Sequence, residues 1–231
     1  MNGAASIRLI GYPVSNYVNI VRSALIEKSL PYELDLRGGS KDEEFLAISP
    51  MGKIPVLEVG GFFLSETVAI LEYLDERFPD QPLRSADLEK RARGRQLMNV
   101  IQMYVEAPAR RLFPGVFMGG RNEPGAEEQV RIVLDVSTAA IARMASPAPF
   151  LCGAAPGAAD LFAFYNLDIV DRLGRHVWDR SIIAECGLSE WAATMRHRES
   201  TKVVLADFDI FFAKYLEDKG AAYHPRIKQE A

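Results

Sequence analysis

Cysteine and histidine are scarce in this 231-residue sequence, which has two cysteines and three histidines. Cys152 and Cys186 lie far apart, and His176, His197 and His224 form no cluster with them. A disulfide scaffold needs many cysteines, and a zinc site needs closely spaced ligands. We therefore expect two isolated buried thiols and no metal.

Long apolar runs and an excess of positive charge are also lacking. No stretch approaches the roughly 20 apolar residues that a membrane helix needs, and residues 1–10 lack the basic and then apolar layout of a signal peptide. The net charge is −4, whereas a nucleic-acid-binding protein needs a clustered basic face. We expect a cytoplasmic protein that binds neither membranes nor nucleic acid.

The rest of the composition is that of an ordinary globular protein, with 48% hydrophobic and 25% charged residues. The length fits one large domain or two modest ones. Residues 1–80 contain 7 Lys and Arg against 12 Asp and Glu. An anion site in this part must therefore depend on local cations, among which Lys41 and Lys53 stand out.

The first 80 residues predict a small mixed sheet with helices on it. A strand over 7–12, a helix over 17–28 and a strand over 32–36 form a βαβ unit, which a short helix over 42–47 follows. Two glycines at 60–61 separate apolar runs over 56–59 and 62–64, which is typical of a hairpin. A helix over 66–78 completes this part.

The remainder of the chain predicts helices only. Residues 79–86 contain two prolines and several polar residues, as an interdomain linker does. Helical stripes then follow over 127–145, 159–173, 188–198 and 203–216, and the tail 220–231 lacks periodicity and is expected to be loosely held. We expect an α/β domain at 1–80, a linker at 81–90 and an all-α domain at 91–231.

Three loops carry polar residues where they could bind a ligand. Ser15 precedes the first helix, where it either caps the helix or donates to a thiolate or phosphate. Pro55 opens the third strand, and a cis Ile54-Pro55 bond would leave the backbone of Ile54 free to pair with an extended ligand, whereas a trans proline would not. Glu66 and Thr67 either cap their helix or bind an amino-acid head group.

The order of these motifs resembles that of the cytosolic glutathione S-transferases. The motifs are PVSNY after the first strand, GKIP before the third and SETVAILEYL after the fourth, and the resemblance is strongest over 54–74. It implies a thioredoxin-like N-terminal domain that binds glutathione as co-substrate, plus an all-α C-terminal domain that helps to bind a hydrophobic electrophile. It also implies a homodimer with a role in detoxification.

The resemblance further implies a serine-type enzyme, similar to the delta, theta and bacterial classes. Ser15 follows Pro13 by two residues, which is the spacing of the catalytic serine in those classes. Tyr12 is one residue too late for the catalytic tyrosine of other classes, and the loop lacks the cysteine of the cysteine-type classes. Asn16 and Tyr17 remain open as alternative donors to the thiolate.

The implied glutathione site contains Ser15, Lys41, Lys53, Ile54, Pro55, Glu66 and Thr67. With the resemblance we expect the Ile54-Pro55 bond to be cis, so that the backbone of Ile54 would pair with the cysteinyl part of glutathione. Glu66 and Thr67 would bind its γ-glutamyl head. Lys53 would meet the glycine carboxylate. For Lys41, a solvated surface position is the equal alternative.

The acceptor site is the least defined part of this prediction. Tyr104 and Phe113 are our candidates to line it, although aromatic residues at helical spacing are more often plain core. We expect conjugation of glutathione to an electrophile. The alternatives are glutathione-dependent isomerase, peroxidase or dehalogenase activity on the same site, or a non-catalytic binding module.

Two further expectations concern the fold. Gly157 stands where the family often begins a buried helix with Ser or Thr, so Asp160 is left to bind the backbone there. The apolar hairpin end at Phe62 and Phe63 offers a surface for the second subunit.

Overall fold

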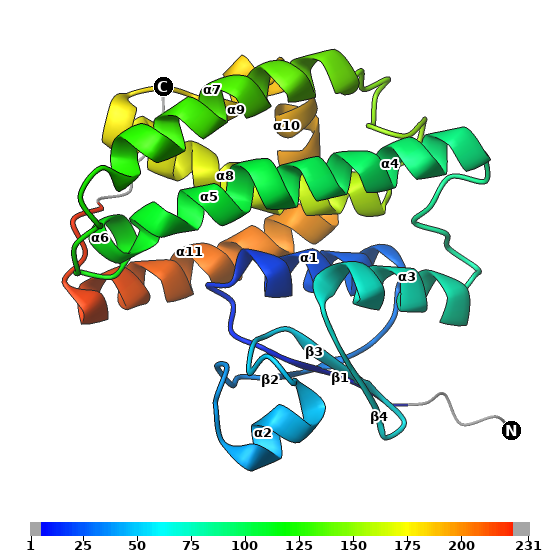
Figure 1. Cartoon of the computed structure of the whole chain (residues 1–231). Coiled ribbons are helices and arrows are strands. Elements are labelled where there is room, and N and C mark those ends of the chain that lie inside the picture. The colour runs from blue at the N-terminus through cyan, green and yellow to red at the C-terminus, as the bar shows by residue number, and fades with distance from the viewer. Residues whose placement is uncertain (1–5, 224–231) are drawn as a thin grey trace, which may run out of the picture.

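The computed structural model describes residues 6–223 and places a small sheet beneath a layer of helices (Figure 1). The strands are β1 (Ile7–Ile10), β2 (Glu33–Asp35), β3 (Val56–Val59) and β4 (Phe62–Ser65). They lie in the order β2-β1-β3-β4, with β2 parallel to β1, and with β3 antiparallel to both β1 and β4. This is the predicted thioredoxin-like arrangement.

Both faces of the sheet are covered by helices from the same part of the chain. These helices are α1 (Asn16–Glu27), α2 (Glu43–Ile48) and α3 (Thr67–Arg77). Figure 1 shows α1 and α3 between the sheet and the helical layer, with α2 on the other face. Side chains alternate accordingly, because Leu9 joins the main core whereas the next residue, Ile10, packs with Phe45 of α2.

The connection between β3 and β4 is the predicted hairpin. Gly60 and Gly61 have φ values of 58° and 88°, which glycine adopts without the steric cost that a Cβ would bring. Val59 and Phe62 pair directly across this turn. The Ile54-Pro55 bond is cis, as the sequence analysis predicted.

Within residues 6–223, every secondary-structure element that follows α3 is a helix. These helices are α4 (Leu88–Ile101), the π-helix η1 (Gln102–Glu106), α5 (Ala107–Ala109), the 3-10 helix η2 (Arg110–Leu112), α6 (Phe113–Phe117), α7 (Ala126–Met144), α8 (Ala158–Trp178), α9 (Ile182–Glu185), α10 (Ser189–Arg196) and α11 (Glu199–Lys219). The all-α prediction for this part is confirmed. None of the helices described is long and apolar enough to span a membrane.

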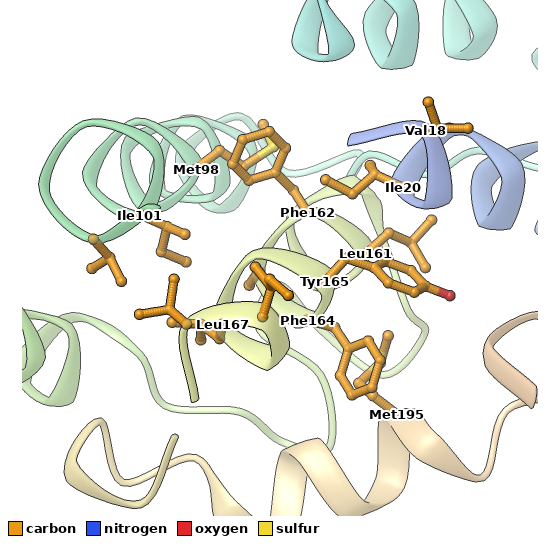
Figure 2. Packing of buried hydrophobic residues seen from close by; sticks show 14 of the residues in the cluster. Val18, Ile20, Met98, Ile101, Leu161, Phe162, Phe164, Tyr165, Leu167 and Met195 are labelled. Carbon is orange, nitrogen blue, oxygen red and sulfur yellow. The ribbon is translucent and has the colours of Figure 1, made fainter. Parts of the chain in front are cut away.

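The buried helix α8 packs against helices from both parts of the chain, α1 and α4. Figure 2 shows Leu161 and Phe162 of α8 beside Ile20 of α1 and Met98 of α4. Both α8 residues are fully buried, as is Ile20. Because α1 packs on the sheet with one side and on α8 with the other, the start of α1 is fixed by both parts of the chain.

The start of α8 confirms the expectation for Asp160. Its carboxylate accepts from the backbone N–H of Gly157 at 3.0 Å and of Leu151 at 2.8 Å, and from Trp191 Nε1 at 2.8 Å. Burial raises the pKa of Asp160, although these donors oppose the shift. The carboxylate therefore makes the half of a capping box that reaches back to the N-cap backbone, while Gly157 has no side chain to make the other half.

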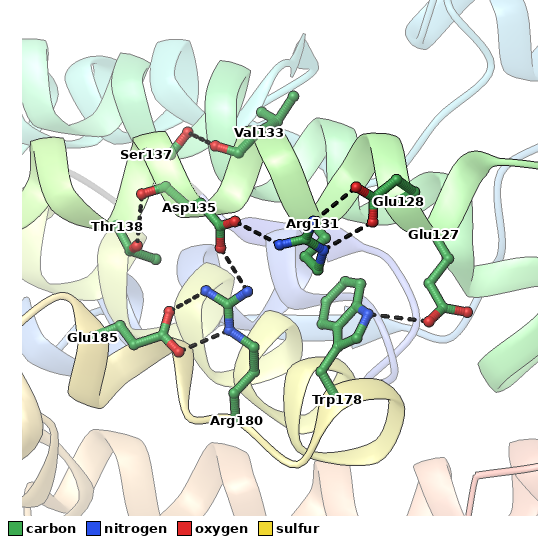
Figure 3. Close-up of polar contacts among 10 residues, drawn as sticks. All are labelled: Glu127, Glu128, Arg131, Val133, Asp135, Ser137, Thr138, Trp178, Arg180 and Glu185. Atoms are coloured by element: carbon green, nitrogen blue, oxygen red, sulfur yellow. Dashed lines mark hydrogen bonds and ion pairs between the residues drawn. The ribbon is translucent and has the colours of Figure 1, made fainter.

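Polar contacts on the outer surface connect α7 to the segment around α9. Figure 3 shows Asp135 of α7 between Arg131 and Arg180, and Arg180 also pairs with Glu185. Arg180 Nη1 lies 2.7 Å from Asp135, and its Nε lies 2.7 Å from Glu185. Exposed ion pairs of this kind contribute little stability individually, so we expect them mainly to orient α7 relative to α9.

The expectation of a loosely held tail is wrong at its first residues. Tyr223 is buried, its ring lies 5.1 Å from that of Phe117, and its N–H donates to the carbonyl of Val116 at 3.1 Å. Packing against Phe117 removes the apolar surface of the Tyr223 ring from water, which holds this part of the tail against the helices. The rest of the expected tail, 224–231, lies outside the described residues.

Candidate active site

A cavity of about 1150 Å³ lies where the sheet and the helical layer meet. The loop before α1, the loop before β3 and the start of α3 form one side of it. The other side consists of the segment from η1 to α6 and parts of α8 and α11. Of the predicted site residues, the lining includes Ser15, Lys53, Ile54, Pro55, Glu66, Thr67 and Phe113.

Ser15 lies at the N-terminus of α1 and caps it. Its backbone is extended, and its Oγ accepts from the N–H of Val18 at 3.4 Å. The bond is long for a hydrogen bond and uses only the oxygen of the hydroxyl. The hydroxyl proton therefore remains available to an acceptor in the cavity, beside the positive end of the helix dipole.

Asn16 and Tyr17, the alternative donors, are engaged with the helical layer instead. Asn16 Nδ2 donates to Glu106 at 3.2 Å and to Asn166 at 2.6 Å, and its Oδ1 accepts from Arg110 at 3.0 Å. The Tyr17 hydroxyl donates to the second oxygen of Glu106 at 2.7 Å. Burial and this carboxylate raise the pKa of the Tyr17 phenol, so its proton is firmly held.

Glu106 and Arg110 were not among the residues that the sequence analysis selected. Glu106 is 1% exposed, and Arg110 Nε lies 2.5 Å from its carboxylate. The π-helix η1 ends at Glu106, and Pro108 follows. A proline inside a helical stretch marks an irregular turn, and π-turns often occur at functional sites, so Pro108 was the available signal.

The loop before β3 presents backbone groups to the cavity. The side chain of the buried Ser49 fixes this loop, because Ser49 Oγ donates to the carbonyl of Lys53 at 2.7 Å and accepts from its N–H at 3.1 Å. The next residue, Ile54, precedes β3 and takes no part in the ladder. Within residues 6–223, neither backbone group of Ile54 has a backbone partner.

Glu66 and Thr67 lie together at the start of α3. Glu66 has a φ of 72°, in the left-handed region that residues with a Cβ seldom occupy. Its exposed carboxylate does not cap α3, so the capping alternative is wrong for Glu66. Thr67 is buried, and its hydroxyl has no hydrogen-bond partner in the described part of the chain. Both side chains are free to meet a ligand.

Lys41 and Tyr104 lie outside the cavity lining. The ammonium of Lys41 donates to the carbonyl of Met51 at 2.8 Å, so Lys41 contacts a lining residue without lining the cavity itself. Tyr104 is 52% exposed, and its carbonyl accepts from Ser137 Oγ at 2.8 Å. Phe113 does line the cavity.

Neither thiol lies in this cavity, and the expectation that both are buried is wrong for Cys152, which is partly exposed. Burial raises the pKa of Cys186 to about 12 and also raises that of Cys152, so both favour the unreactive protonated form. Among residues 6–223 no group of three or more histidine, cysteine or acidic side chains is placed to hold a metal ion. The lining of this cavity, as far as residues 6–223 show it, therefore offers no cysteine thiolate as a nucleophile.

Comparison with known proteins agrees with this geometry. Residues 9–82 match the family described as "Glutathione S-transferase, N-terminal domain". A glutathione S-transferase from Pseudomonas putida is 36% identical over 179 residues, which cover 78% of this chain and 81% of that protein. The chain therefore belongs to the glutathione S-transferase family.

Two further relatives refine this comparison. A glutathione S-transferase structure from Rhodospirillum rubrum superimposes with a TM-score of 0.71 at 26% identity, covering 86% of this chain and 91% of that one. A maleylacetoacetate isomerase from Dictyostelium discoideum is 39% identical over 87 residues, 35% of this chain and 40% of that protein. The family thus includes an isomerase among the relatives of this chain.

Proposed function

We propose that this protein is a glutathione transferase that joins the glutathione thiolate to an electrophilic small molecule. The single observation that carries the proposal is the convergence of Ser15, Ile54 and Glu66, each with a free hydrogen-bonding group, on one cavity. Retention of this set together favours an active glutathione site, and glutathione binding without turnover would favour a non-catalytic module instead. The full chain, purified and tested for glutathione binding by calorimetry and then with a panel of electrophiles, provides the test.

Ser15 is our choice of thiolate donor, which makes this a serine-type enzyme. A free thiol has a pKa of about 8.5, so only a few per cent is ionised at neutral pH. A hydroxyl donor at a helix N-terminus lowers that pKa. The protons of Asn16 and Tyr17 already serve Glu106 and Asn166, which supports Ser15 over both.

The remaining site residues suit the other parts of glutathione. The free backbone groups of Ile54 pair with the cysteinyl unit in the manner of an added strand. The hydroxyl of Thr67 and the N–H groups at the start of α3 donate to the γ-glutamyl carboxylate, while the Glu66 carboxylate accepts from the ammonium. Lys53, exposed at the cavity, receives the glycine carboxylate. Lys41 stabilises the loop before β3 by donating to the carbonyl of Met51, and its ammonium adds positive charge to this side of the site.

The chemistry then needs no protein nucleophile. The sulfur of glutathione supplies the electron pair for a new carbon–sulfur bond, and the leaving group departs with the pair of the bond that breaks. Ser15 stabilises the negative sulfur before attack, and the cavity holds the two reactants close together, which accounts for much of the acceleration in such reactions. We assign glutathione binding to residues 1–80 and most acceptor contacts to 91–231.

A second candidate is glutathione-dependent isomerisation on the same site. The similarity to a maleylacetoacetate isomerase favours it and points to a subclass near that enzyme rather than to the delta or theta classes. Here the thiolate would add to a double bond, the adduct would rotate, and glutathione would leave unchanged. A cis-configured unsaturated acid converted without net loss of glutathione would distinguish isomerisation from conjugation.

We also propose a homodimer in the cytoplasm. Phe62 is 49% exposed at the hairpin end, with its ring 5.2 Å from that of Tyr73 on α3. An exposed aromatic pair of this kind gives a second subunit apolar surface to cover.

A further inference from the structure

Arg110 gives the acceptor side of the cavity a positively charged side chain. It lies at the start of η2, lines the cavity, and its side chain is 44% exposed. The guanidinium packs over two aromatic rings, with its carbon 5.2 Å from the ring centre of Tyr17 and 5.3 Å from that of Phe113. These rings hold the guanidinium in one orientation.

Within residues 6–223, only part of the donor capacity of Arg110 is used. Its Nε pairs with Glu106, and its Nη2 donates to Asn16 at 3.0 Å. A guanidinium carries five N–H groups, so these two bonds leave others for a ligand. Two parallel N–H groups match the two oxygens of a carboxylate.

The other charged groups of the cavity leave Arg110 as the cation for the second substrate. The charged lining residues are Lys53, Glu66, Glu106 and Arg110. The proposed function assigns Lys53 and Glu66 to glutathione. Glu106 is buried, and both of its oxygens already accept hydrogen bonds from Asn16, Tyr17 or Arg110. Glu106 offsets some of the Arg110 charge, so directional hydrogen bonding matters more here than net charge.

We propose that Arg110 makes this site selective for electrophiles that carry a carboxylate. The inference rests on the proposed function and adds the substrate class. Arg110 binds the carboxylate with its free N–H groups, and the apolar lining at Phe113, Phe117 and Phe212 accepts the carbon skeleton. A purely apolar acceptor would leave the free donors of Arg110 unpaired beneath it, which lowers its affinity.

A matched pair of glutathione conjugates tests the proposal without turnover. S-benzylglutathione and its carboxybenzyl analogue, with the carboxylate at the meta or para position, are titrated into the full-length protein by calorimetry. We expect the better carboxylated conjugate to bind roughly 10- to 150-fold more tightly, the factor that a hydrogen bond to a charged group supplies. Arg110→Met should abolish this advantage, and Arg110→Lys should retain part of it.

Arg111→Met is the matched control. Arg111 is the next residue, but it donates to Gln129 at 2.9 Å and does not line the cavity, so its loss should leave the advantage intact. Structural damage from the lost Asn16 bond would weaken both conjugates alike and leave their ratio unchanged. Equal affinities in the wild type, or an advantage that survives Arg110→Met, would overturn the proposal. Failure to bind glutathione or either conjugate would refute the proposed function itself.

Discussion

Replacing Ser15 separates the two roles that its hydroxyl can play. The cap bond to Val18 is long at 3.4 Å, so we expect its loss in Ser15→Ala to cost at most about 1 kcal/mol of stability. Glycine is itself a tolerable cap, so Ser15→Gly should cost only a few tenths of a kcal/mol. Both variants lose the hydroxyl proton, whereas only the alanine variant also loses a good cap.

The effect on the thiol should be the same in both variants. A hydrogen bond to a charged group contributes about 1.5 to 3 kcal/mol, so its loss should raise the pKa of bound glutathione by roughly 1 to 2 units. Less thiolate then exists at neutral pH, and conjugation should fall roughly 10- to 150-fold. The rate should recover as the pH rises, because the thiol then ionises without help.

The assay follows the ultraviolet absorbance of the bound thiolate against pH, with glutathione affinity measured by calorimetry. Measured at a pH below the pKa of the bound thiol, affinity should change little, since Ile54, Glu66 and Thr67 hold the tripeptide. Ser15→Thr, which keeps a hydroxyl, serves as the control and should titrate close to the wild type. If Ser15→Gly and the wild type gave the same thiolate titration, the hydroxyl would be only a helix cap. A shift found instead in Tyr17→Phe would show that Tyr17 is the donor.

Three further outcomes are expected. Glu66→Gln should weaken glutathione binding by about tenfold without moving the thiol pKa, because it removes the partner of the ammonium; unchanged affinity in calorimetry would contradict this role. Phe62→Glu should lower the mass in light scattering from twice 25.7 kDa to 25.7 kDa, and a wild type that is already monomeric would disprove the dimer. Burial would raise the pKa of Asp168, but Arg172 and Arg196 hold it below its ordinary value of 3.8. This stabilisation is present at neutral pH and is lost as the pH falls through the folded-state pKa, so acid should lower the melting temperature of the wild type more than that of Asp168→Asn. Parallel loss in both proteins would exclude Asp168 as the acid-sensitive group.

The strand-bearing part of the chain was well predicted because its signals are local. Two glycines define a hairpin, and the short apolar run over 7–12 that ends in a turn marks a strand. The cis bond at Ile54-Pro55 came from the family resemblance, since local sequence favours trans. The order of motifs carried the candidate site, because no single one of them distinguished a ligand site from an ordinary helix cap.

The helical side of the site could not be predicted in the same way. The π-helix η1 adds a residue to one turn and so shifts the phase of the side chains that follow. Tyr104 was selected as an aromatic residue, but it lies within η1 and is half exposed, whereas the charged residues Glu106 and Arg110 line the cavity. Glu106 is also paired by Asn16, which lies 90 positions away in the sequence. Short-range sequence patterns do not predict contacts between residues so far apart in the chain.

The amide of Asn16 has a consequence for recombination between members of this family. It links the start of α1 to Glu106 and to Asn166, two residues on separate helices of the other half. A chimaera that joined the sheet of this chain to the helices of a relative would keep every proposed glutathione contact. Without a carboxylate and an amide opposite Asn16, however, it would bury an unpaired polar group directly beside Ser15. Halves from different members of this family can therefore be exchanged only where the groups opposite Asn16 can hydrogen-bond to its amide.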